Sequence, residues 1–556
     1  MPSDLRAQAK AWLADDPDRA TRDELRTLLD GLPDTEAELA DRFAGPLRFG
    51  TAGLRGPLRA GPNGMNQAVV RGAAAGLVRW LDAKQAAGAL VIGYDARHGS
   101  ADFATETARV AAGTGRRALL LPRPVPTPVL AYAVRALDAA AGVMVTASHN
   151  PPTDNGYKVY LGAELGGPTG AGAQIAPPAD EEIEAAIRAV GPLADVPLGE
   201  VHVDGVLGDA IVDRYLTDAA GVVAGATPRE LRVAYTPLHG VGGAVLSAAL
   251  ERAGFGRPVA VPEQAEPDPE FPTVAFPNPE EPGAMDRVIA LASETGADLA
   301  LANDPDADRC AVAVRDWSGS GGHPMVDWRI LRGDEVGVLL ADHLIRRGVT
   351  GLYATTIVSS SLLRTLCAAR GVPYGESLTG FKWIVRTDGT APLAYGYEEA
   401  LGYCVAPDLV RDKDGITAAL LVCELAAELK SEGRGLDNRL DELAREFGVY
   451  ATDQLSVRVT DLGEIAAMMD RLRAAPPATL LGAPAKFTDL LPATDGVRVA
   501  SPHARVVVRP SGTEPKLKAY LEVVEPVGDG DVAAARTHAA AKLATLRIET
   551  AAALGG

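Results

Sequence analysis

The chain has 556 residues and is acidic, with 73 Asp and Glu against 54 Lys and Arg and a formal net charge of −19. This balance argues against a general nucleic-acid or membrane-surface binder, so an anionic ligand would have to be met by a local cluster of basic side chains. The hydrophobic share of 47% is ordinary for globular proteins, and the length predicts roughly three or four domains.

The start of the chain has no apolar signal core, and no charge-free apolar run of about 18 residues follows. The four cysteines show no CxxC spacing, which argues against a zinc site or a disulfide framework: Cys310, Cys367, Cys404 and Cys423. The sequence therefore predicts a soluble, cytoplasmic protein with buried free thiols.

Two helices are predicted near the start, over residues 4–15 and 22–30, with Thr21–Glu24 as a capping box for the second. A glycine-rich loop follows at residues 47–56 and carries Arg48 and Arg55. This loop is either a flexible turn or a cradle of backbone and guanidinium groups for an anion.

A strand at 90–94 and a helix over 101–112 come next. The letters of Gly113–Ala118 match a GxGxxA dinucleotide motif. Because this stretch closes a helix and opens a strand, the reverse of the context that the motif needs, a dinucleotide site is rejected.

The apolar run from Ala139 to Val145 predicts a buried strand, which ends in Thr-Ala-Ser-His-Asn-Pro-Pro. Two prolines forbid a continued sheet or an immediate helix, so Ser148 lies on a loop at the carboxyl end of a strand, where open α/β sheets bind ligands. A turn serine is the alternative. The neighbours His149 and Lys158 add more polar groups than a turn requires, but the Gly-x-Ser-x-Gly elbow of hydrolases is absent. The residues alone suggest a nucleophile without defining its chemistry.

Residues 162–180 are rich in Gly, Ala and Pro and predict a surface excursion before a helix from Asp180. The strand, loop and helix pattern begins again at 231–253 and at 352–361, which predicts successive α/β units of domain size. Beyond about residue 455 the pattern is that of a smaller α+β domain, with strands at 454–459, 496–500 and 505–508 and helices at 462–474 and 532–546.

Three carboxylates follow the apolar strand at 299–302 at spacings i, i+2 and i+4: Asp304, Asp306 and Asp308. An extended loop would place these alternate side chains on one side, where their repulsion calls for a cation, and hard carboxylate oxygens suit Mg²⁺. A calcium EF-hand is excluded because its sixth and twelfth positions would be Arg309 and Arg315. A solvated acidic turn is the other interpretation.

Two later loops also carry candidate binding groups. Glu398 and Glu399 lie between glycines and could hydrogen-bond neighbouring sugar hydroxyls or cap a helix. The stretch Arg509–Lys518 combines an arginine, two hydroxyls, a glycine and two lysines, which favours a phosphate cradle over an exposed turn.

Taken in order, four motifs resemble those of the α-D-phosphohexomutase family of phosphoglucomutases and phosphomannomutases: TASHNPP with the following NGYKVY, DPDADR, GYEEALG and RPSGTEPK. Supporting stretches are LRFGTAGLRG, YTPLHGVGG and the Ser377–Lys382 loop. The motifs span residues 47–518, and within the family the chain most resembles the branch of phosphoglucomutase-2-like and phosphopentomutase-like proteins.

The resemblance implies an α/β fold, with three similar α/β domains plus a C-terminal α+β domain around a central active-site cleft. The expected domains carry, in order, the phosphoserine loop, the metal loop, the sugar-binding loop and the phosphate-binding loop: residues 1–205, 206–325, 326–455 and 456–556.

Residue roles are carried over from the family by motif. Ser148 would carry a phosphoryl group, and one Mg²⁺ would be bound by an oxygen of phosphorylated Ser148 with Asp304, Asp306 and Asp308. The groups expected around the transferring phosphoryl group are Arg55, His149, Lys158 and Arg309. Those expected at the sugar are Thr379, Gly380, Lys382, Glu398 and Glu399, and those at its second phosphate are Arg509, Ser511, Gly512 and Thr513.

The activity implied is a mutase that interconverts hexose 1-phosphate and 6-phosphate, with glucose first and mannose next, through a phosphoserine enzyme and a bisphosphorylated sugar. A glucose 1,6-bisphosphate-type activator and a small phosphosugar partner are expected, with no nucleic acid or membrane. Ala400 stands where many family members have Ser, which removes a hydroxyl contact to the sugar. A phosphopentomutase, a metal-dependent sugar phosphatase and a non-catalytic sugar-phosphate-binding protein are the alternatives.

Overall fold

The computed structural model describes residues 2–48, 53–201, 205–315, 328–387, 389, 391–459, 462–511, 516–528 and 530–555. The chain divides into two compact units. The first comprises residues 1–331 and 401–428, and the second comprises residues 332–400 and 429–556.

Three helices begin the first unit: α1 (Pro2–Asp15), α2 (Arg19–Asp30) and α3 (Glu36–Arg42). The two predicted helices are confirmed, but the capping box is wrong. The N-cap of α2 is Asp18, whose side chain accepts the Ala20 N–H, so Thr21 lies inside the helix. Glu24 accepts instead from the Ala60 N–H and from Arg42. An acidic side chain three residues earlier in the chain was the stronger competitor for the free N–H groups.

The first sheet has the order β1-β5-β4-β2-β3, in which β2 runs parallel to β3 and β4, and β5 is antiparallel to both of its neighbours. Its strands are β1 (Leu54–Pro57), β2 (Leu90–Tyr94), β3 (Ala118–Leu120), β4 (Ala141–Val145) and β5 (Asp154–Leu161). The accompanying helices are α4 (Gln67–Ala83), α5 (Ser100–Gly113), α6 (Thr127–Ala136), α7 (Ala163–Gly170) and α8 (Ala179–Arg188), with a 3₁₀ turn at Leu193–Asp195. Since α5 ends at Gly113 and β3 begins at Ala118, rejection of the dinucleotide motif is confirmed.

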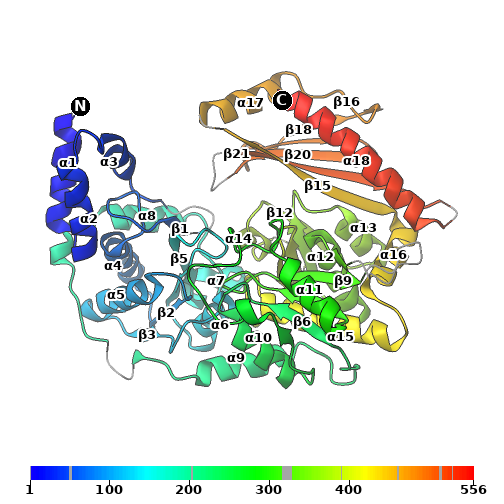
Figure 1. The fold of residues 1–556 in the computed structure, drawn as a ribbon, viewed down its shortest axis with the longest axis horizontal. Helices are drawn as coiled ribbons and strands as arrows, with labels where there is room; N and C mark the ends of the chain where they lie inside the picture. Colours follow the sequence, from blue (N-terminus) through cyan, green and yellow to red (C-terminus); the bar gives the residue numbers. More distant parts are fainter. Residues whose placement is uncertain are drawn as a thin grey trace. The chain divides into compact units, whose positions relative to one another are not determined.

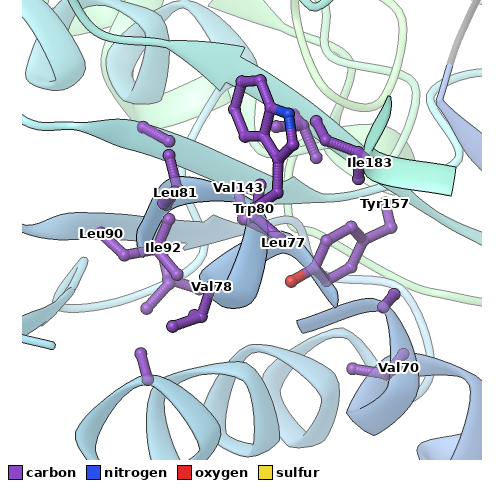
Figure 2. Packing of buried hydrophobic residues seen from close by; sticks show 14 of the residues in the cluster. Val70, Leu77, Val78, Trp80, Leu81, Leu90, Ile92, Val143, Tyr157 and Ile183 are labelled. Atoms are coloured by element: carbon purple, nitrogen blue, oxygen red, sulfur yellow. The ribbon is translucent and has the colours of Figure 1, made fainter. Parts of the chain in front are cut away.

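The core of this sheet is formed where α4 packs on β2, β4 and β5 (Figure 2). Leu77 and Leu81 of α4 are fully buried with Ile92, Val143 and Tyr157 from the strands. Each large apolar side chain buried in this way stabilises the fold by about 1.5–3 kcal/mol. This packing holds the carboxyl ends of β2 and β4 in place.

The prediction of a surface excursion over residues 162–180 is wrong for its second half. Ala173, Ile175 and Ala176 are buried, and the Ile175 N–H donates to the Val159 carbonyl at 3.0 Å. Small residues let the returning backbone approach the sheet closely, and a Gly- and Ala-rich composition does not distinguish that packing from a loop.

The second sheet repeats this arrangement, with the order β10-β9-β8-β6-β7, a parallel β7-β6-β8 group and antiparallel β9 and β10. Its strands are β6 (Val233–Thr236), β7 (Val259–Ala260), β8 (Leu299–Ala302), β9 (Ala311–Arg315) and β10 (Trp328–Ile330). Its helices are α9 (Ala210–Ala220), α10 (Gly242–Arg252) and α11 (Asp286–Thr295), with a 3₁₀ turn at Pro262–Gln264. The first unit also contains β14 (Gly402–Cys404) and the start of α15 (Gly415–Ser431).

In the second unit, β11 pairs in parallel with β12 and with β13, as β2 and β6 do with their neighbours. The elements of this part are α12 (Gly333–Arg346), β11 (Leu352–Thr356), α13 (Leu362–Arg370), β12 (Tyr374–Ser377), α14 (Phe381–Ile384), β13 (Leu393–Glu398) and α16 (Leu436–Phe447). The predicted restart of the α/β pattern is therefore confirmed.

The last sheet is antiparallel throughout, in the order β15-β21-β20-β19-β18, and α18 packs along β15 and β21 (red helix, Figure 1). Its elements are β15 (Val449–Arg458), α17 (Leu462–Ala474), β18 (Lys486–Asp489), β19 (Val497–Ala500), β20 (Ala504–Pro510), β21 (Lys516–Glu525) and α18 (Val532–Leu554). A small hairpin of β16 (Thr479–Leu480) and β17 (Ala483–Pro484) stands apart. The predicted fold class, three similar α/β arrangements and a C-terminal α+β arrangement, is confirmed.

All four cysteines are free and buried, as expected. Within the described ranges, the helices are too short or too polar for any of them to cross a bilayer.

Candidate active site

The predicted serine lies directly after β4 in a strained backbone conformation. Ser148 has φ +53°, and its N–H donates to the Thr146 hydroxyl at 2.8 Å. A left-handed conformation costs a non-glycine residue roughly 1–2 kcal/mol, and such strain is concentrated at functional sites. The side chain is 2% exposed. Ser148 lies in a turn, and its burial and backbone strain are more than a turn requires.

The three aspartates follow β8 in a tight turn. Ala307 has φ +53°, and its N–H donates to the Asp304 carbonyl at 2.8 Å. The carboxylates converge as predicted, with candidate ligand atoms all within 4.8 Å of one another, and they are buried. The predicted route to this arrangement, alternation along an extended loop, is wrong, because a left-handed residue folds the loop back on itself.

The serine and aspartate loops meet in the first unit. The Ser148 hydroxyl donates to Asp304 Oδ2 at 2.7 Å, and His149 Nδ1 lies 3.1 Å from Ser148 Oγ. Thr127, at the start of α6, donates its N–H to the Asp306 carbonyl and its hydroxyl to Asp306 Oδ2, at 2.9 and 2.7 Å. Loops about 150 residues apart in sequence therefore form one polar site.

Basic side chains surround these carboxylates. Lys158 Nζ donates to Asp306 Oδ2 at 2.7 Å and to Asp308 Oδ2 at 3.1 Å, and Lys413 Nζ lies 3.4 Å from Asp308 Oδ2. Further out, Arg309 pairs with Glu280 at 3.2 Å. Arg55 donates to the Asn150 side chain of the serine loop at 3.2 Å. The site therefore has the local cluster of cations that an anionic substrate requires in an acidic protein.

Burial and charge move the pKa values of the site in different directions. Burial, together with Asp306 and Asp308, raises the pKa of Asp304 well above its usual value. Burial also works to raise the pKa of Asp306, but the Lys158 ammonium outweighs it and the pKa is lowered. The pKa of His149 is lowered by burial and by the Arg309 charge, so its imidazole is uncharged near neutral pH.

Two carboxylate oxygens of the triad fit a hard cation. Asp306 Oδ1 and Asp308 Oδ1 are buried and, within the described part of the chain, have no hydrogen-bond partner. Buried polar atoms are almost always paired, and hard carboxylate oxygens are the ligands that Mg²⁺ takes. The aspartates therefore form a group that fits a divalent cation, and the solvated acidic turn is excluded because all three side chains are buried.

A glycine-rich loop after β6 supports the metal loop. The Val241 N–H donates to the Pro305 carbonyl at 2.8 Å, and a Cβ on Gly240 would lie 2.3 Å from the Pro305 Cα. The two backbones thus touch where only glycine fits.

We expect Gly240→Ala to displace the metal loop, since neither backbone can yield cheaply. The free energy of unfolding should fall by about 1–3 kcal/mol, and a divalent cation that binds the aspartates should stabilise this variant less than the wild type. Thermal unfolding with and without Mg²⁺ measures both effects. Gly256→Ala, where nothing lies within 4 Å of the new Cβ, is the matched control. Equal behaviour of the two variants would contradict this support role.

The predicted sugar and phosphate residues lie in the second unit. Glu399 follows β13 and accepts from the Ser359 hydroxyl at 3.0 Å, and the segment after it is a turn, so a helix-capping role is excluded. Burial raises the pKa of Tyr520, and the charges of Glu399, Arg509 and Glu398 also act on it. The acidic loop and Arg509 are therefore close to the same phenol.

The remaining predicted residues of the second unit fall in two stretches of the chain. Thr379 and Gly380 connect β12 to α14, Gly380 has φ +107°, and Lys382 is buried within α14. Ser511 closes the hairpin of β20 and β21, with its N–H donating to the Lys516 carbonyl at 2.8 Å. Gly512 and Thr513 lie outside the described residues.

The site of the first unit thus brings together every predicted residue from its sequence range: Arg55, Ser148, His149, Lys158, Asp304, Asp306, Asp308 and Arg309. Sequence reasoning missed Thr127, Arg97 and Lys413, which reach the serine loop or the aspartates. Lys413 comes from a segment about 100 residues after the metal loop, and no local pattern marks it.

Comparisons with known proteins agree with this geometry. Four models of phosphoglucomutase/phosphomannomutase domains match the chain in order: α/β/α domain I at residues 46–192, domain II at 213–319, domain III at 332–447 and the C-terminal domain at 455–538. A "Probable phosphomannomutase" of Haemophilus influenzae is 46% identical over 469 residues, covering 83% of this chain and 93% of that protein.

Two further relatives carry other sugar names. A "Phosphoglucomutase" of Staphylococcus aureus (strain USA300) is 32% identical and covers 90% of this chain and 93% of its own. A "Probable phosphoribomutase" of Schizosaccharomyces pombe is 34% identical and covers 92% of each. A solved structure of a phosphoglucomutase/phosphomannomutase family protein from Burkholderia thailandensis shares the fold, with a TM-score of 0.66 and 20% identity over 90% of this chain and 97% of that one.

The matched domains and the named relatives place the chain among the phosphosugar mutases. The chain belongs to the α-D-phosphohexomutase family of phosphoglucomutases and phosphomannomutases, enzymes that transfer phosphate within a sugar.

Proposed function

We propose that the protein interconverts the 1-phosphate and 6-phosphate of a hexose through phosphorylated Ser148 and a bisphosphorylated sugar intermediate. One observation carries the proposal: the buried Ser148 hydroxyl lies 2.7 Å from Asp304 Oδ2, in a triad with two buried carboxylate oxygens left for a cation. A nucleophile held against such a group is what phosphoryl transfer requires, since its catalysis is mostly positioning and charge stabilisation.

In the proposed first step, the phosphoryl group passes from Ser148 Oγ to a hydroxyl oxygen of the sugar monophosphate. The P–Oγ bond breaks and a P–O bond to the sugar forms, while the sugar hydroxyl loses its proton and Oγ gains one to become a hydroxyl. His149 Nδ1, uncharged and 3.1 Å from Oγ, is placed to take the proton of the Ser148 hydroxyl when that oxygen attacks a phosphate in the reverse transfer. The second step is the reverse transfer from the other phosphate of the intermediate.

The cations of the site hold the charge of the phosphoserine, about −1.5 to −2. Lys158, Lys413 and Arg309 already lie at the carboxylates, and Arg55 is tied to the serine loop. Asp304, Asp306 and Asp308 would hold Mg²⁺ with a phosphoserine oxygen, and the ion would neutralise charge on the transferring group.

The second unit is proposed to bind the sugar and the phosphate that is not transferred. Glu398 and Glu399 would bind hydroxyls, the Thr379–Lys382 loop would position the ring, and Arg509 with Ser511–Thr513 would hold the phosphate that is not transferred. The proposed domains are residues 1–205, 206–325, 326–455 and 456–556, closing around a central cleft that excludes water and protects the phosphoenzyme.

Glucose and mannose phosphates are the proposed substrates, with a glucose 1,6-bisphosphate-type activator that phosphorylates Ser148. A pentose phosphate is the second candidate, favoured by the name of the Schizosaccharomyces pombe relative and by Ala400, which offers no hydroxyl to the sugar. The cytoplasm is the proposed location, where four free thiols remain reduced.

The test is conversion of glucose 1-phosphate with Mg²⁺ and a trace of glucose 1,6-bisphosphate, with mannose 1-phosphate and ribose 1-phosphate run in parallel. Appearance of the 6- or 5-phosphate establishes the mutase, and the best substrate settles the sugar. Free phosphate without an isomer, independent of the bisphosphate, would replace the proposal with a phosphatase. No turnover of any sugar by folded, metal-loaded protein would leave a binding protein.

A further inference from the structure

A buried arginine beneath the serine loop has no role in the function proposed so far. Arg97 lies three residues after β2 and is 4% exposed. Its guanidinium group donates to four backbone carbonyls of the serine loop. The acceptors are Ser148 O at 2.6 Å, Asn150 O at 2.5 Å, Pro151 O at 2.8 Å and Asp154 O at 3.1 Å.

Three of these carbonyls belong to the loop between β4 and β5, which contains two prolines without an N–H, and the fourth belongs to Asp154, where β5 begins. Within the loop, the Asp154 N–H donates to the Pro151 carbonyl at 3.0 Å, and Arg97 adds donors to that carbonyl and to the other three. A buried carbonyl left without a donor would cost about 1–3 kcal/mol. A guanidinium group presents five N–H donors in a rigid plane, whereas a lysine ammonium offers three donors from a single point. Only arginine can bind four carbonyls spread over seven residues at once.

Arg97 is itself held from two sides. Its N–H donates to Asp95 Oδ1 at 3.0 Å, and Ser100 donates to the same oxygen at 2.6 Å. The guanidinium carbon lies 4.9 Å from the centre of the Phe271 ring. Phe271 is 2% exposed and belongs to the sequence range of the metal loop rather than that of the serine. Arg97 therefore contacts both the serine loop and Phe271, a residue from the sequence range that carries the metal loop.

We propose that Arg97 is a positioning residue that fixes the serine loop so that Ser148 Oγ faces Asp304. The inference rests on the proposed role of Ser148. Arg97 donates to the carbonyl of Ser148 itself, while the Oγ of the same residue lies 2.7 Å from the carboxylate. A displacement of the loop by about 1 Å is enough to lower phosphoryl transfer by up to 10²-fold, because the reacting atoms need near-attack geometry.

The test compares Arg97→Lys with Arg116→Lys. Arg116 is a matched control because its side chain is 9% exposed and it binds the Ala86 and Gly88 carbonyls and Asp82, away from the serine loop. We expect Arg97→Lys to lower kcat, and the rate of Ser148 phosphorylation by glucose 1,6-bisphosphate, by about 10- to 100-fold. The KM for the sugar phosphate and the Mg²⁺-induced rise in Tm should stay close to wild type. Arg116→Lys should lower Tm to a similar extent with kcat unchanged.

A kcat and phosphorylation rate for Arg97→Lys equal to those of Arg116→Lys would overturn the positioning role. If Arg97→Lys does not fold, Phe271→Leu replaces it, because leucine removes the ring under the guanidinium and leaves every donor in place. That variant should lower kcat several-fold at constant KM, and an unchanged kcat would also overturn the role. Failure of the proposed function is seen separately, as absence of turnover by the wild-type protein.

Discussion

Ser148→Ala is expected to lower turnover of the sugar phosphate by at least about 10³-fold, because removing the nucleophile of a covalent mechanism removes the step and leaves only binding. Alanine keeps the Cβ and removes only the hydroxyl, so the fold should persist. The Mg²⁺-induced rise in Tm should also persist, since the three carboxylates remain. Coupled assays for the isomerised sugar measure the first effect, and thermal unfolding measures the other two.

Ser293→Ala is the matched control for this change, since Ser293 is an exposed serine of α11 that donates to the Ile289 carbonyl of its own helix. Incubation of each protein with glucose 1,6-bisphosphate, followed by intact-mass measurement, should show one added phosphoryl group on the control and none on Ser148→Ala. Turnover by Ser148→Ala at a wild-type rate would exclude the phosphoserine mechanism, even if the protein proved to be a mutase.

Asp304→Asn is expected to leave the unfolding temperature of the metal-free protein unchanged or higher, and to abolish the rise in that temperature on addition of Mg²⁺. The pKa of Asp304 is raised by burial and by the charges of Asp306 and Asp308, so its ionised form is costly in the metal-free fold. An amide removes that cost, and the metal-free variant should unfold at the wild-type temperature or above it. The Mg²⁺-induced rise in Tm should be lost, and turnover should fall by at least about 10²-fold.

The measurement is thermal unfolding in a chelator and across a Mg²⁺ titration, with Asp286→Asn on the exposed face of α11 as control. A variant that is less stable than wild type in the chelator would show that Asp304 holds the metal-free fold together through its bond to Ser148. A retained Mg²⁺ response would remove Asp304 from the ligand set.

Residues that lie directly after a buried strand were accessible to sequence reasoning. Ser148 and Asp304 follow β4 and β8, which occupy the same position in two sheets of the same strand order. Glu398 ends β13, the corresponding strand of the third parallel group. Apolar runs broken by polar motifs are local signals, and the carboxyl ends of such strands are where open α/β sheets bind ligands.

Contacts between distant segments were not accessible. Lys413 reaches Asp308 because its neighbours are held by buried tyrosines: Tyr160 donates to Asp412 at 2.9 Å, and Tyr215 donates to Asp414 at 3.0 Å. None of these pairs has a periodic or compositional signature. The capping box failed for the opposite reason, since a correct local rule at Thr21 competed with another at Asp18, and the structure alone decides between them.

The pairing of Lys158 with Asp306 and Asp308 bears on the stability of the protein when no cation is bound. Two internal ammonium groups, those of Lys158 and Lys413, already offset much of the negative charge of the triad. Repulsion among the three aspartates is therefore too small, without a bound cation, to unfold this part of the protein and expose it to proteases. We expect protein prepared without the cation to stay folded and to regain full turnover when the cation is added back, so that activity can follow the supply of the ion without new synthesis.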